Sequence, residues 1–144
     1  IDPMQLMLEI TETAAITNFQ TAVDFIDRLS EIGCRFALDD FGAGLSSFGY
    51  LKRMKVDFIK IDGQFVKGMA TDPIDRMMVN NITHLAYGLG LFVIAESVED
   101  EILMEMLRDI GVHFAQGFHV QRPTTIEDWK KENLLKTIFM RTVH

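Results

Sequence analysis

Five short apolar runs recur along the chain, and each is followed by polar residues and then by a stretch with helical periodicity. Apolar runs of this length, bounded by polar positions, predict buried strands. The strands are expected at residues 4–10, 35–38, 56–61, 91–95 and 113–120.

The segments between these runs place apolar residues on one face of a helix. One helix is expected between Asn18 and Gly33, and another begins with Asp72 as N-cap and Pro73 in its first turn. The three apolar stripes are Phe19, Val23, Ile26, Leu29 and Ile32; Ile74, Met77, Met78, Leu85 and Leu89; and Ile102, Leu103, Met106, Leu107 and Ile110, followed by Gly111.

The end of the chain predicts one more helix. Residues 125–128 resemble a capping box, and the apolar positions that follow are Trp129, Leu135, Ile138 and Phe139. The connection at 46–55 has no clear periodicity. Because strand and helix alternate elsewhere, the pattern favours an α/β fold with a parallel sheet and helical crossovers.

Composition limits the class of protein further. The chain has 144 residues, about the size of one domain, and its apolar fraction of 48% is ample for a core. A net charge of −7 argues against sequence-independent binding to duplex nucleic acid. Cys34 has no cysteine to pair with in this chain, which favours a reducing, cytoplasmic setting. We expect no membrane segment, because no apolar run approaches the length of a bilayer span.

Charged residues follow the predicted strands. Adjacent Asp39 and Asp40 end the second strand, although two like charges at a strand mouth repel each other unless a cation offsets them. In a parallel α/β sheet, catalytic groups gather at the carboxyl ends of strands. The other polar residues at strand ends are Glu9, Lys60, Asp62, Glu96 and Gln116.

Each of these features alone has a structural explanation. Glu9 and Glu12 could belong to a strand that leads into a helix cap, and Lys60 with Asp62 could be a structural ion pair. Glu96 and Glu99 could be acids that favour a helix N-terminus. Together, however, they predict a convergent carboxylate site with one lysine, which is what two divalent cations and a phosphate ester require.

Two short matches to known motifs do not indicate the corresponding protein classes. Residues 40–42, Asp-Phe-Gly, match the metal-binding triplet of protein kinases, but the catalytic loop and glycine loop of a kinase are missing from this sequence. Residues 42–44 also lack the third glycine of a dinucleotide-binding fingerprint.

Five ordered motifs, LEITET, LDDFGAGLSS, VDFIKIDGQFV, VIAESVE and AQGFHVQRP, are similar to the second half of an EAL domain. Residues 4–123 carry this resemblance. Two mild departures are Ser97, where the family usually has glycine, and Ala43, where threonine is common. The Glu-Ala-Leu motif itself, with its neighbouring arginine and the following asparagine ligand, is absent.

The resemblance implies that residues 1–144 are the C-terminal portion of a single EAL domain, a partial (β/α)8 TIM-like barrel with about five strand-helix units. The family hydrolyses cyclic di-GMP to linear pGpG with two cations, and an oxygen-rich carboxylate site suits Mg²⁺ or Mn²⁺ better than zinc. The implied partners are cyclic di-GMP and a second copy of the chain in a homodimer.

The resemblance also implies a role for each matched residue. Glu9, Asp39, Asp40 and Glu99 would be metal-site residues, and Glu12 would hold the glycine-turn loop. Lys60 would position the attacking water, with Asp62 beside it. Glu96 would be the general base or an acid near it, and Glu99 and Gln116 would complete the network around metal and water.

Two other hypotheses stay open. A non-catalytic cyclic di-GMP receptor would be expected to have lost Lys60, Asp39 or Asp40, and this chain retains all three. A half-barrel with unpaired sheet edges could instead pair with another copy. Such a half-barrel would have weak or no activity alone.

Overall fold

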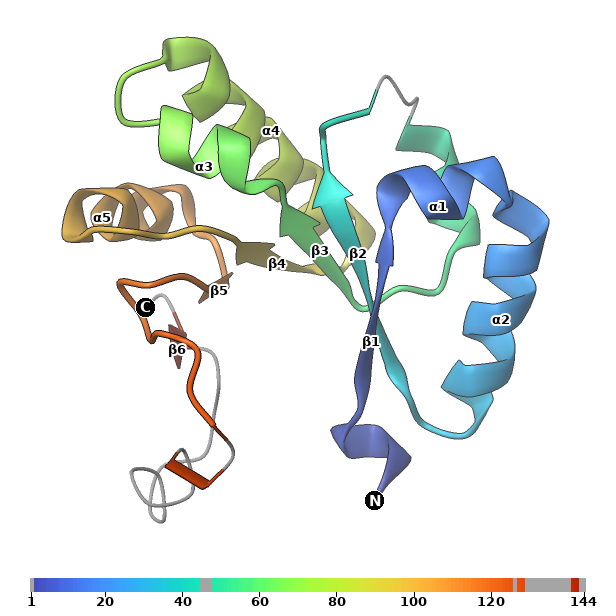
Figure 1. Ribbon diagram of the computed structural model, residues 1–144. Coiled ribbons are helices and arrows are strands. Elements are labelled where there is room, and N and C mark those ends of the chain that lie inside the picture. Colours follow the sequence, from blue (N-terminus) through green and yellow to red (C-terminus); the bar gives the residue numbers. More distant parts are fainter. Residues whose placement is uncertain (1, 45–47, 126, 129–140, 143–144) are drawn as a thin grey trace.

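The computed structural model describes residues 2–44, 48–125, 127–128 and 141–142. Its strands alternate with helices along one curved sheet (Figure 1). The elements are η1 (Pro3–Gln5), β1 (Met7–Thr11), α1 (Glu12–Thr17), α2 (Phe19–Glu31), β2 (Arg35–Phe41), η2 (Phe48–Arg53), β3 (Phe58–Ile61), α3 (Gly63–Gly68), α4 (Pro73–Leu89), β4 (Phe92–Ala95), α5 (Glu101–Ile110), β5 (Phe114–Ala115) and β6 (Arg141–Thr142).

The sheet has the order β1-β2-β3-β4-β5-β6, so neighbours in space are also neighbours in sequence. Strands β1 to β5 pair in parallel, which confirms the predicted parallel sheet with helical crossovers. The short strand β6 pairs antiparallel with β5 and was not predicted. All carboxyl ends of β1 to β5 therefore meet at one edge of the sheet.

The predicted strand at 113–120 is wrong beyond Ala115. After β5 the chain turns at Gly117, where a Cβ would overlap the backbone of Val98. Val98 N–H donates to the carbonyl of Gln116, and His119 N–H donates to the carbonyl of Val98. Residues 116–119 thus pair with the loop after β4 instead of extending the strand.

The predicted helix boundaries hold where capping chemistry sets them. The Asp72 carboxylate accepts from Ile74 N–H at 2.8 Å with Pro73 next to it, and α5 ends at Gly111 with a φ of 89°. Helices α1 and α3, one and a half turns each, were not predicted. At the predicted capping box, Asp128 N–H donates to Thr125 Oγ1 at 3.1 Å, and the helix expected after it lies outside the described residues.

The alternation of side chains along each strand divides the core into two clusters. On β3, Ile59 and Ile61 lie in the large cluster with residues of α2, α4 and α5. Four members of the predicted stripes are exposed instead: Ile32, Ile74, Met77 and Ile102. Phe58, two residues from Lys60, packs on the opposite face with Ala37 and Ile94. That opposite face therefore carries Lys60, and it is where the site is built. No described helix has the length and hydropathy to cross a membrane.

Candidate active site

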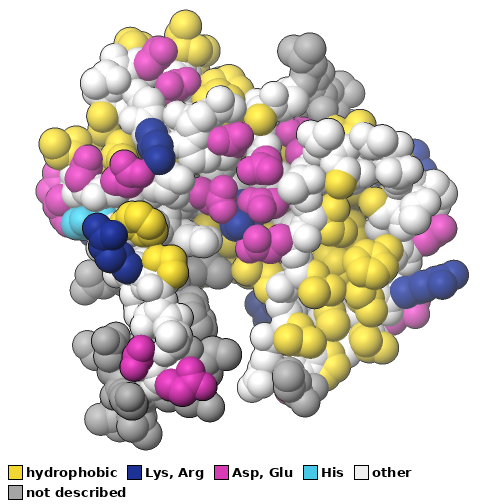
Figure 2. Space-filling model, viewed as in Figure 1, with side chains coloured by type: hydrophobic (Ala, Val, Ile, Leu, Met, Phe, Trp, Pro, Cys, Tyr) yellow, Lys and Arg dark blue, Asp and Glu magenta, His cyan; other side chains and the backbone are white. Residues whose placement is uncertain are grey.

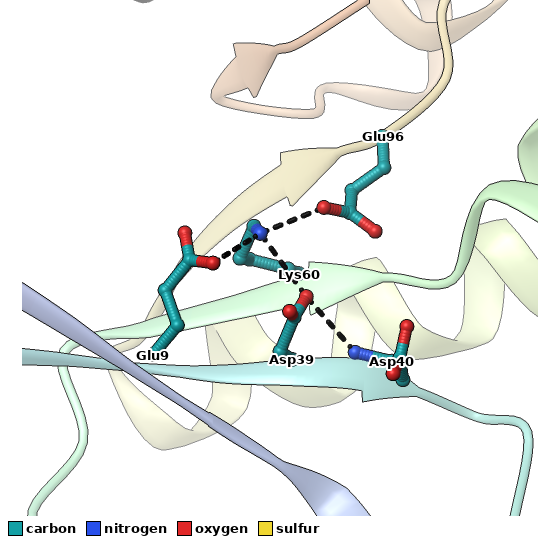
Figure 3. A network of polar contacts seen from close by, with 5 residues as sticks. All are labelled: Glu9, Asp39, Asp40, Lys60 and Glu96. Atoms are coloured by element: carbon teal, nitrogen blue, oxygen red, sulfur yellow. Dashed lines mark hydrogen bonds and ion pairs between the residues drawn. The ribbon is translucent and has the colours of Figure 1, made fainter.

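One lysine ammonium lies at the centre of the carboxylate cluster on this face (Figures 2 and 3). Lys60 Nζ contacts Glu96 Oε1 at 2.7 Å, Glu9 Oε2 at 2.9 Å and Asp39 Oδ1 at 3.1 Å. Its side chain is only 3% exposed. An ammonium has three N–H donors, so these three carboxylates engage all of them.

Strand register explains why these residues meet. Lys60 on β3 pairs with Ile94 on β4, and Glu96 lies two residues beyond Ile94, so its side chain points to the same face. On the other side, Asp39 is two residues from Ala37 in β2, and Ala37 pairs with both Glu9 and Phe58. Glu9 therefore lies level with Phe58, two residues before Lys60 along the strand direction, and its longer side chain reaches Lys60.

Asp39 and Asp40 do not follow the normal alternation of a strand. Consecutive strand residues normally point to opposite faces of a sheet. Here, one carboxylate oxygen from each of Asp39, Asp40 and Glu96 lies within 4.8 Å of the other two. The β2–β3 register shifts between Leu38 and Phe41, and Asp40 has a φ of 54°. This bulge in a left-handed conformation turns Asp40 toward the cluster.

The cluster perturbs the pKa values of its members. Burial alone would lower the pKa of Lys60, but its hydrogen bonds to Glu96, Glu9 and Asp39 outweigh burial and raise it, so the ammonium stays charged. Burial raises the pKa of Glu96 although Lys60 lowers it, and Asp39 and Asp40 add to the rise. Desolvation and the neighbouring aspartates raise the pKa of Asp40.

Glu12 lies beside the glycine turn, next to the cluster. It is the first residue of α1 and only 2% exposed. Its Oε2 accepts from Gly42 N–H at 3.2 Å, and its Oε1 accepts from the hydroxyl of Tyr50 in η2 at 2.5 Å. Burial, together with the hydrogen bond to Glu12 and its charge, raises the pKa of Tyr50 well above its ordinary range.

The remaining predicted residues lie around the cluster. Asp62 caps α3, accepting from Gln64 N–H at 2.8 Å, and the ion pairs of Lys60 among the described residues do not include it. Glu99 forms an ion pair with Lys67 at 2.7 Å. Gln116 lines two pockets, one of about 310 Å³ shared with Glu96 and Glu99 and one of about 430 Å³ shared with Glu9.

Sequence patterns missed Tyr50 and Lys67. Tyr50 lies in the connection where no periodicity is visible, and Lys67 lies on the unpredicted helix α3. The signal that could have pointed to Tyr50 is its place in the connection that follows the two adjacent carboxylates and the glycine turn, six residues after Gly44.

The donor set fits a hard divalent cation. Asp39, Asp40 and Glu96 offer only carboxylate oxygens, which are the ligands that Mg²⁺, Mn²⁺ and Ca²⁺ prefer. The three oxygens lie within 4.8 Å of one another, a spacing that one ion can bridge with small side-chain adjustments. Glu9 is 43% exposed and borders the same cluster.

A parallel α/β sheet with carboxylates and a lysine at the carboxyl ends of its strands is typical of a metal-dependent hydrolase. The model of the EAL domain family matches residues 1–123, so the chain belongs to the EAL domain family. This confirms the family and the TIM-like fold that the motifs implied.

Relatives and solved structures agree with this assignment. The chain is 40% identical over 121 residues to cyclic di-GMP phosphodiesterase PdeB of Shewanella oneidensis, covering 84% of this chain and 14% of that protein. The PaMucR phosphodiesterase in complex with c-di-GMP superposes with a TM-score of 0.85 at 37% identity, covering 89% of this chain and 52% of that one. BlrP1 of Klebsiella pneumoniae, solved with manganese and cyclic di-GMP, superposes with a TM-score of 0.76 at 33% identity, covering 82% of this chain and 30% of that one. The chain thus spans about half of the PaMucR structure and a smaller part of the other two proteins.

Proposed function

We propose that this chain is the C-terminal part of a single EAL domain that hydrolyses cyclic di-GMP to linear pGpG with Mg²⁺ or Mn²⁺. The observation that carries the proposal is the cluster of Asp39, Asp40 and Glu96 beside buried Lys60 at the carboxyl ends of three neighbouring strands. The names of the relatives supply the substrate, and the all-oxygen donor set supports the metal.

Asp39 and Asp40 would hold the cation pair, with Glu9 and Glu96 at its sides. A cation bound there would neutralise the phosphodiester and lower the pKa of a water molecule. Glu96 would accept the proton of that water, and its raised pKa suits a general base better than an ordinary carboxylate. The water oxygen would form the new bond to phosphorus, the bond from phosphorus to the 3′-oxygen would break, and the 3′-oxygen would take up a proton from solvent.

Lys60 would orient the attacking water. All three of its N–H donors contact carboxylates, so one of these contacts must be exchanged for the water during the reaction. Glu99 and Gln116 line the pocket of about 310 Å³ that Glu96 also lines, and they would contact substrate or water there. Asp62 would act indirectly, through the position of α3 and through its charge near Asp40.

The experiment is hydrolysis of cyclic di-GMP by this chain with Mn²⁺, with pGpG measured by anion-exchange chromatography. Lys60→Ala is compared with Lys55→Ala, which removes the same charge from an exposed pair with Asp27. We expect slow, cation-dependent release of pGpG that is lost in Lys60→Ala and kept in Lys55→Ala. Equal product from both variants, or none from the unchanged chain, contradicts a working site in this chain.

Calorimetry under the same conditions distinguishes the receptor hypothesis from hydrolysis, because it measures the binding of cyclic di-GMP itself. Cation-dependent binding of cyclic di-GMP without any pGpG would replace hydrolysis by recognition as the proposed function. The homodimer and the cytoplasmic location remain predictions; light scattering of the purified chain with and without Mn²⁺ tests the first.

A further inference from the structure

One buried carboxylate, that of Glu12, contacts both the end of the β2 segment and η2. Glu12 uses one oxygen for the N–H of Gly42, at the start of the turn, and the other for the hydroxyl of Tyr50, beyond it. Glu12 is 2% exposed, so no bulk water competes for these oxygens. The Tyr50 hydroxyl therefore fixes the direction in which the Glu12 carboxylate points.

This turn decides where Asp40 points. Asp40 adopts a φ of 54° and Gly42 a φ of 98°, and a non-glycine residue in the left-handed region is strained unless its surroundings impose that conformation. The turn also packs closely: a Cβ on Gly42 would lie 2.9 Å from Ile82 Cδ1 and 3.1 Å from Phe65. Packing on one side and Glu12 on the other thus keep Asp40 beside Asp39.

We propose that Tyr50 is a positioning residue for the carboxylate cluster. Its hydroxyl orients Glu12, and Glu12 holds the turn that follows Asp40. Tyr50 donates to Glu12 and lies outside the group of carboxylates that could hold a cation, so it would act on cation affinity through the geometry of those carboxylates. This inference rests on the proposed cation-dependent function of the same site.

The test compares Tyr50→Phe with Tyr87→Phe, because the two tyrosines of the chain make similar hydrogen bonds at different places. The Tyr87 hydroxyl donates to the carbonyl of Gly111 at 2.5 Å, at the end of α5 and away from the cluster. Each variant removes one hydroxyl hydrogen bond, which is partly buried at Tyr50 and exposed at Tyr87, and keeps the ring. Free Mn²⁺ is measured by electron paramagnetic resonance during titration, and folding is checked by circular dichroism.

We expect Tyr50→Phe to weaken Mn²⁺ binding by about tenfold, the lower end of what loss of a partner outside the ligand set usually causes. Tyr87→Phe should bind Mn²⁺ as the unchanged chain does. The exchange rate of the Gly42 amide hydrogen, followed by NMR without metal, should rise in Tyr50→Phe only. In a Glu12→Gln background, Tyr50→Phe should weaken Mn²⁺ binding by a smaller factor than it does alone, because both substitutions act through the same side chain.

The outcomes are distinct. If the unchanged chain binds Mn²⁺ and Tyr50→Phe binds it equally well, the positioning role is wrong and the proposed function stands. If both tyrosine variants lose the same affinity, the effect is general stability and the positioning role is again wrong. If the unchanged chain binds no Mn²⁺, the cation site and the inference fail together.

Discussion

Replacement of Lys60 by methionine should destabilise the protein strongly, because it leaves three carboxylates without their shared cation. Lys60 Nζ lies 2.7 to 3.1 Å from the three oxygens, and the side chain is 3% exposed. At an effective dielectric constant of about 20, one such charge pair is worth about 5.5 kcal/mol, much of which the desolvation of the ammonium offsets. Loss of one partner from a buried pair costs about 3–5 kcal/mol. Because Glu9 is 43% exposed, we expect about 3 kcal/mol.

The assay is urea unfolding at pH 7 without divalent cations, with Lys55→Met as the matched control. Lys55 pairs with Asp27 at 2.9 Å, but its side chain is 72% exposed. Such a surface pair contributes below about 1 kcal/mol. For a chain of this size, the loss of 3 kcal/mol corresponds to a fall in Tm of about 6–12 °C.

The loss should also depend on pH. Burial raises the pKa of Glu96, and the hydrogen bond and charge of Lys60 lower it, so removal of Lys60 lets that pKa rise further above 4.5. A carboxylate with a raised folded-state pKa stabilises the fold below its unfolded pKa, and that stability is lost as the pH rises through the folded value. The difference between Lys60→Met and the unchanged chain should therefore grow from pH 4 to pH 7. A loss at pH 7 no larger than that of Lys55→Met, or a larger loss at pH 4, would refute this reasoning.

Two further predictions concern the contact between Gly63 and Ser97 and the side chain of Asp40. A Cβ on Gly63 would overlap Ser97 Oγ and lie 2.8 Å from Ser97 Cβ, so Gly63→Ala should cost about 1–3 kcal/mol in urea unfolding. Ser97 has a φ of 56°, so Ser97→Gly should stabilise the protein by about 0.5 kcal/mol. In the double variant, Ser97→Gly should also remove most of the cost of Gly63→Ala. If the two effects on the free energy of unfolding are additive instead, the contact between these residues is contradicted. Asp40→Asn should raise the Tm of the cation-free protein by about 1–3 °C, since it relieves an exposed like-charge contact, and should weaken Mn²⁺ binding measured by calorimetry. An unchanged Mn²⁺ affinity would remove Asp40 from the ligand set.

Local sequence chemistry was enough for much of the fold. Helix α4 begins after Asp72 and α5 ends at Gly111, as predicted, because capping bonds and a positive φ act over a few residues. The parallel sheet follows from the alternation of strands with amphipathic helices. The placement of Lys60, Asp39 and Glu96 together follows from the meeting of strand carboxyl ends.

Other features depended on contacts between distant residues. The strand predicted at 113–120 ends at Ala115, because the loop after β4 takes the hydrogen bonds of the following residues. This difference concerns which distant backbone groups a segment meets, and no local pattern encodes that.

The sequence by itself determined the carboxylates, the lysine and the strands that carry them. Only the tertiary structure decided that Asp39 and Asp40 face the same side, since an ideal strand would turn them apart. A bulge opposite β3, a left-handed Asp40 and the contact from Glu12 to Gly42 together impose this arrangement. The physical reason is that a strained backbone persists only where packing and hydrogen bonds from elsewhere in the chain compensate for it.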